Sequence, residues 1–89
     1  MKKVISYDYG KQIVILQRGW VFVGDMKRVG HECELTNASC VRRWGTTNGL
    51  GELAENGPLK DTVLDKCPTV RFNYLTVVGQ IECNEKNWP

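Results

Sequence analysis

The chain has 89 residues, of which 42% are hydrophobic and 25% charged, and its net charge is only +2. This length predicts a single domain, residues 1–89, with a core small enough that we expect a homo-oligomer. The weak charge argues against binding through nucleic-acid phosphates, so specific nucleic-acid binding is not expected. No run approaches the roughly 18 apolar residues of a membrane span, and the first ten residues lack the apolar region of a signal peptide, so no membrane contact is expected.

Three β-strands are predicted in the first half of the chain. Ile13 to Arg18 and Trp20 to Arg28 are rich in Val, Ile, Phe and Trp, with Gly19 placed for a bend between them. His31 to Thr36 alternates between apolar and polar residues, and Gly30 before it supplies a turn. The second and third strands therefore form a predicted hairpin.

A short helix is predicted after the third strand. Leu50, Leu53 and Ala54 have the spacing of one helical face, with Thr47 or Asn48 as the expected cap. The Gly-Pro pair at residues 57–58 ends this helix.

Two strands are predicted in the last third of the chain, Thr69 to Leu75 and Val77 to Cys83, and the segment 59–68 is expected to be a loop. The polar tail contains Trp88, which we expect to dock on the body of the protein or on another subunit. The predicted fold class is mainly β (α+β). It is a small antiparallel half-open barrel or curved sheet of about five strands with one short inserted helix.

The four cysteines and the one histidine form no recognisable metal or catalytic motif. There is no CxxC pair, and the HxC pair of His31 and Cys33 has no partners at zinc-module spacing. We expect reduced cysteines that pack as small apolar side chains, with no metal and no cofactor. Because no nucleophile, base and orienting group stand together, the protein is not expected to be an enzyme.

Arginine and tryptophan stand together twice, as Arg18 with Trp20 and as Arg42, Arg43 and Trp44. An indole stacks on planar groups, and a guanidinium binds phosphate or carboxylate with two hydrogen bonds. If the two strands are neighbours, both pairs would line one concave surface for a planar, anionic ligand. In the alternative interpretation, Trp44 is a core or hinge residue and the arginines are solvated.

The run ELTNASCVRRWG, followed by GLGELAENG, resembles a motif of small proteins from tailed phages and prophages whose domain has no known function. The resemblance covers roughly residues 12 to 88, and Ser39-Cys40-Val41 depart from it by separating Asn-Ala from the arginines. It implies a phage origin and the cytoplasm of the host as the setting, and it implies no reaction. The matching residues are Leu35, Asn37, Ala38, Arg42, Arg43, Trp44, Leu50, Leu53, Ala54, Gly57 and Trp88.

Three functions are compatible with these features. The favoured hypothesis is a non-enzymatic phage anti-defence protein that sequesters a nucleotide-derived host immune signal. The alternative is a protein-binding inhibitor of a host defence complex of the anti-CRISPR type, and the third is a structural or DNA-associated phage protein. The expected ligand-binding residues are Arg18, Trp20, Asn37, Arg42, Arg43 and Trp44.

Overall fold

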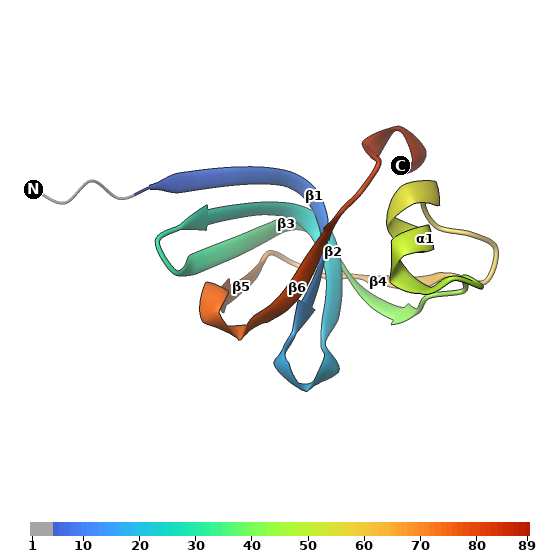
Figure 1. Ribbon diagram of the computed structural model, residues 1–89, viewed down its shortest axis with the longest axis horizontal. Coiled ribbons are helices and arrows are strands. Elements are labelled where there is room, and N and C mark those ends of the chain that lie inside the picture. The colour runs from blue at the N-terminus through green and yellow to red at the C-terminus, as the bar shows by residue number, and fades with distance from the viewer. Residues whose placement is uncertain (1–4) are drawn as a thin grey trace, which may run out of the picture.

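The computed structural model describes residues 5–89 and shows a strongly curved antiparallel sheet with one helix (Figure 1). The predicted fold class is confirmed, with six strands where about five were expected. The elements are β1 (Ser6–Leu16), β2 (Val21–Val29), β3 (Glu32–Arg43), α1 (Gly49–Asn56), β4 (Val63–Lys66), β5 (Val70–Asn73) and β6 (Val77–Glu82), with short 3-10 turns at Gln17–Gly19, Tyr74–Thr76 and Glu85–Asn87.

The first three strands form a meander of neighbouring antiparallel strands, and the predicted hairpin is its β2–β3 half. The last strand, β6, returns to the free side of β1, where Ile81 pairs with Ile13. Both β4 and β5 pair with the outer side of β3. The sheet is therefore ordered β4 and β5, then β3, β2, β1 and β6, and among the described residues its two outer edges pair with no further strand.

Together, β4 and β5 act as one strand with a break. Cys33 pairs with Phe72 and Cys40 pairs with Asp65, so the same register holds on both sides of the break. Continuing that register places Pro68, which has no N–H group, opposite Asn37, whose φ of 50° is left-handed. The expected loop over residues 59–68 is wrong for β4, because pairing with β3 orders a segment whose own charges give no strand pattern.

The central strands are buried on both faces, so the protein has two small cores. Val21 and Val23 point to the face that α1 covers, and Met26 points to the face that β5 covers. We call them the helix-side core and the β5-side core. The helix-side core contains Ile13, Val21, Val23, Val41, Leu53, Ala54, Cys83 and Trp88, and the β5-side core contains Val14, Met26, Cys33, Leu35 and Ala38.

The C-terminal tail packs against α1. The indole Nε1–H of Trp88 donates to the carbonyl of Ala54 at 3.0 Å, and the residue is only 9% exposed. At the end of α1, the Gly57 N–H donates to the Leu53 carbonyl at 2.9 Å with a φ of 77°, as expected for a glycine that ends a helix. The predicted docking of Trp88 on the body of the protein is therefore confirmed.

Candidate functional site

The turn between β1 and β2 presents the first arginine–tryptophan pair. The Leu16 N–H donates to the Trp20 carbonyl at 2.8 Å across the turn, and Arg18 has a left-handed φ of 68°. Trp20 is 57% exposed, and its ring stacks on Phe22 with the ring centroids 6.1 Å apart. Trp20 is thus a surface aromatic side chain that Phe22 holds in place.

The end of β3 presents the second group. Arg42 forms an ion pair with Asp65, with Nε 3.2 Å from Oδ2, and both side chains are exposed. Such a surface pair contributes less than about 1 kcal/mol to stability. Arg43 is exposed as well, and Trp44 is 44% exposed, so Trp44 is not a core residue.

The two groups flank neighbouring strands, Arg18 and Trp20 just before β2 and Arg42 and Arg43 at the end of β3. The β2–β3 pairing ends at Phe22 and Cys40, two residues short of Trp20 and of Arg42. Asn37 lies further back in β3, where it forms a bulge and its Nδ2 donates to Asp25 Oδ2 at 3.0 Å. Ligand binding by these residues stays a prediction.

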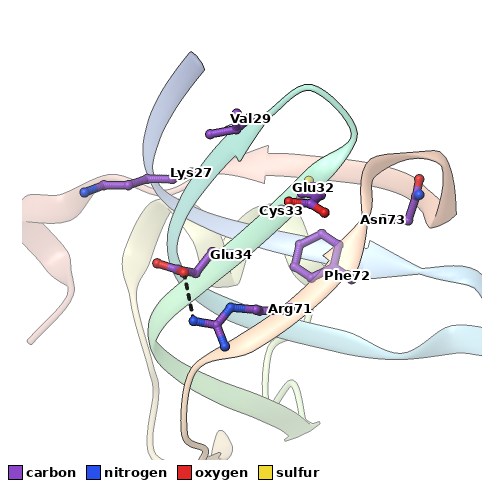
Figure 2. A pocket seen from close by; sticks show the side chains of 8 residues that line it. All are labelled: Lys27, Val29, Glu32, Cys33, Glu34, Arg71, Phe72 and Asn73. Carbon is purple, nitrogen blue, oxygen red and sulfur yellow. Dashed lines mark hydrogen bonds and ion pairs between the residues drawn. The ribbon is translucent and has the colours of Figure 1, made fainter. Parts of the chain in front are cut away.

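A first cleft, of about 570 Å³, lies on β2, β3 and β5 (Figure 2). Its lining carries two cationic side chains, Lys27 and Arg71, and two anionic ones, Glu32 and Glu34. Arg71 Nη2 lies 3.3 Å from Glu34 Oε2, and Lys27 pairs with Glu34 in the ladder. The lining therefore has no net charge, so the cleft has little attraction for a charged ligand.

Two further clefts involve the C-terminal part of the chain. One, of about 430 Å³, carries an acidic excess from Glu55, Glu82 and Glu85. The other, of about 340 Å³, lies over the face of β1 to β4 and is lined by two lysines but by no Asp or Glu side chain. Of the six residues expected to bind a ligand, Asn37 alone lines any of these three clefts.

An arginine–tyrosine cluster at the other end of the β2–β3 hairpin was not predicted. The Arg28 guanidinium lies 3.6 Å from the ring centroid of Tyr74 and 5.1 Å from that of Tyr7. Its Nε donates to the Gly30 carbonyl at 2.6 Å, and Tyr7 stacks on Tyr9. The cluster ties β1, β2 and the turn after β5 together. The i, i+2 spacing of the two tyrosines in SYDYG is a strand signal that could have revealed it.

Among residues 5–89, no strand pairs with the outer edge of β6. The Cys83 N–H donates to the Lys11 carbonyl at 3.1 Å, so this pair is hydrogen-bonded to β1. In an antiparallel ladder the alternate residues, Gln80 and Glu82, then direct their own N–H and C=O groups away from β1.

The two edges of the sheet differ in the residues that discourage pairing with another chain. Natural edge strands usually carry charges or proline, which discourage pairing with another chain. The β4–β5 edge carries Lys66, Pro68 and Arg71, whereas β6 has no charge before Glu82 and no proline. The unprotected edge is therefore β6.

Large apolar side chains are exposed beside the start of this edge. Leu75 and Val78 are each 69% exposed, in addition to Trp20. Leu16 of β1 lies between Trp20 and the start of β6. It pairs with Val77 of β6, and its N–H donates to the Trp20 carbonyl. We call Trp20, Leu75 and Val78 the tip patch.

Three of the four cysteines have a raised thiol pKa. Burial raises the pKa of Cys33, of Cys40 and, to about 11, of Cys83, so these thiols remain protonated near neutral pH. His31 lies exposed in the β2–β3 turn. Within residues 5–89 no group of three or more His, Cys, Asp or Glu side chains could hold a metal ion.

No protein-family model, curated protein or solved structure matches this chain. No helix in residues 5–89 has the length and apolar character needed to cross a membrane. The function therefore has to be inferred from the side chains and surfaces of the protein itself.

Proposed function

We propose that this protein is a non-enzymatic binding protein that attaches to a protein partner through the tip patch and the open edge of β6. The observation that carries the proposal is the exposure of Leu75 and Val78, 69% each, at the start of an edge strand that carries no charge before Glu82. Large apolar side chains that are exposed close together on a surface commonly mark a protein interface. An added strand would gain backbone hydrogen bonds along β6 and specificity from the patch.

The partner that fits is an extended protein segment with apolar residues flanked by acidic ones. Trp20 offers a large anchor, and tryptophan and arginine are enriched among the residues that dominate interface energies. Arg18, two residues away in the same turn, favours carboxylates around the apolar segment. Together with the resemblance to phage proteins, this leads us to propose a host protein, such as a component of a defence complex, as the partner.

Capture of a nucleotide-derived ligand is the second candidate. It is supported by the adjacency of β2 and β3, whose last pair, Phe22 with Cys40, lies two residues from Trp20 and from Arg42. Against it, Arg42 is already paired with Asp65, and none of the three clefts is lined by an arginine–tryptophan pair. A surface that presents its aromatic and apolar groups without a cleft suits a protein partner better than a small ligand.

Site-specific photo-cross-linking tests the proposal. A photoreactive phenylalanine derivative at position 78 should give a discrete adduct with a host protein. The same group at Val63, an exposed valine on the opposite edge, should give none. The partner is then identified, purified and titrated by calorimetry. We expect Val78→Lys to weaken its binding about tenfold or more and Val63→Lys to change it less than about twofold.

Two results would overturn the proposal. The first is an adduct at position 78 that contains only a second copy of this chain, which would make the β6 edge a self-association surface. The second is equal affinity of the purified partner for the wild-type protein and for Val78→Lys. A shift in melting temperature with a signalling nucleotide that Arg42→Ala abolishes would instead support the second candidate.

A further inference from the structure

We propose that the 340 Å³ cleft over the face of β1 to β4 binds a phosphate-bearing small molecule. This site is separate from the tip patch, and none of the proposed protein-binding residues lines it. Its volume lies at the small end of the range for ligand sites. The lining residues used below are Lys11, Asn37, Ser39, Lys66 and Trp88.

The electrostatics of this cleft differ from those of the other two. Neither Lys11 nor Lys66 forms an ion pair with any described residue, so both charges are available to a ligand. Asp25, which pairs with Lys11 in the ladder and accepts a hydrogen bond from Asn37, competes for this lysine, and Lys11 also borders the glutamates of the second cleft. The lining of the 340 Å³ cleft nevertheless holds two lysines and no Asp or Glu side chain, whereas the lining of the first cleft is balanced and that of the second has one more acid than base.

The sheet places the two lysines on either side of a hydroxyl. Ser39 pairs with Lys66 on one side and with Val23 on the other, so it lies between β4 and β2. Lys11 belongs to β1, about 14 Å from β4 at three strand spacings of about 4.8 Å. Long lysine side chains from the two strands can therefore approach one anion from opposite sides, above the Ser39 hydroxyl.

Polar and apolar groups complete the cleft. The Ser39 hydroxyl has no hydrogen-bond partner within residues 5–89 and can donate to a phosphate oxygen. The Trp88 ring is held by its bond to the Ala54 carbonyl, and Lys11 Nζ lies 5.8 Å from the ring centroid. Trp88 thus supplies a rigid wall for the planar or apolar part of a ligand, such as the base of a mononucleotide.

Nuclear magnetic resonance titrations with inorganic phosphate and with AMP test the site, using the Trp88 indole N–H as the reporter. We expect saturable binding of AMP with Kd below about 1 mM, and weaker binding of phosphate alone. Lys66→Met should raise the Kd for AMP about tenfold, the effect expected when one charge-assisted contact is lost. The matched control is Lys27→Met in the first cleft of the same sheet, which should change the Kd less than about twofold.

The proposal is overturned if neither probe gives a saturable shift up to about 10 mM, or if Lys27→Met weakens binding as much as Lys66→Met. The second result would show that AMP responds to the net charge of the protein and does not bind at a specific site. Because Lys66 is exposed, its replacement should leave the circular dichroism spectrum unchanged. Val78→Lys should leave AMP binding unaffected, so failure of the protein-binding proposal can be distinguished from failure of this one.

Discussion

Cys83 follows β6 and lies in the helix-side core, where burial raises the pKa of its thiol from 9.0 to about 11. The unfolded chain releases this proton near pH 9, whereas the folded chain keeps it until about pH 11. The folded state therefore binds more protons in this interval. The free energy of unfolding should fall by up to about 1.4 kcal/mol per pH unit as the pH rises through it. Urea denaturation at several pH values, with reductant present, measures this slope.

Comparison with Cys83→Ala isolates the effect, because tyrosine and lysine side chains titrate in the same range. Below about pH 9 the free energy of unfolding of the wild-type protein should exceed that of the variant by its largest amount. This difference should become smaller as the pH rises toward 11. A constant difference in unfolding free energy between about pH 8 and 11 would show that the Cys83 thiol does not carry the dependence.

Among the strands, the contact between β2 and β3 depends on Gly24. A methyl group at this position would lie 2.8 Å from the Thr36 carbonyl oxygen and 3.1 Å from Ala38 Cα. Backbone atoms of a paired strand cannot move aside easily, so Gly24→Ala should lower the free energy of unfolding by about 1–3 kcal/mol. Gly51→Ala is the control, because nothing lies within 4 Å and α1 gains about 0.5–1 kcal/mol from alanine. Stabilisation by both substitutions in urea denaturation would contradict this account.

The strands were predictable to the extent that each one carries its own pattern. The alternation over His31 to Thr36 and the turn at Gly30 predicted the β2–β3 hairpin. The third strand was expected to end at Thr36, but β3 continues to Arg43. The bulge at Asn37 made this continuation unrecognisable from the sequence. A bulge adds one residue and inverts the alternation, so the pattern after it reads as a new element.

The candidate site was less predictable than the fold. The sequence singled out Trp20 and Trp44, but their exposure depends on what covers them, which is a property of the assembled sheet. The cleft that holds Lys11 and Lys66 joins residues that are more than fifty positions apart and carry no local motif. Such a site forms only when β1 and β4 enter the same curved sheet.

For the whole molecule, the two cores share their strands. Ile13 and Val14, neighbours in β1, point into the helix-side core and the β5-side core respectively. The same strands therefore contribute to both cores. Loss of either core leaves these strands packed on one face only. A domain built in this way should unfold in a single cooperative transition.

One substitution in each core tests this cooperativity. Leu53→Ala empties part of the helix-side core and Leu35→Ala part of the β5-side core, and both leucines are fully buried. Each should lower the free energy of unfolding by about 2–5 kcal/mol. In both variants, each carrying Trp20→Phe and Trp44→Phe so that Trp88 in the helix-side core is the remaining tryptophan, fluorescence and far-ultraviolet circular dichroism should give the same midpoint. If Leu35→Ala lost its circular dichroism signal before its fluorescence changed, the two cores would be independent units and the shared strands would not couple them.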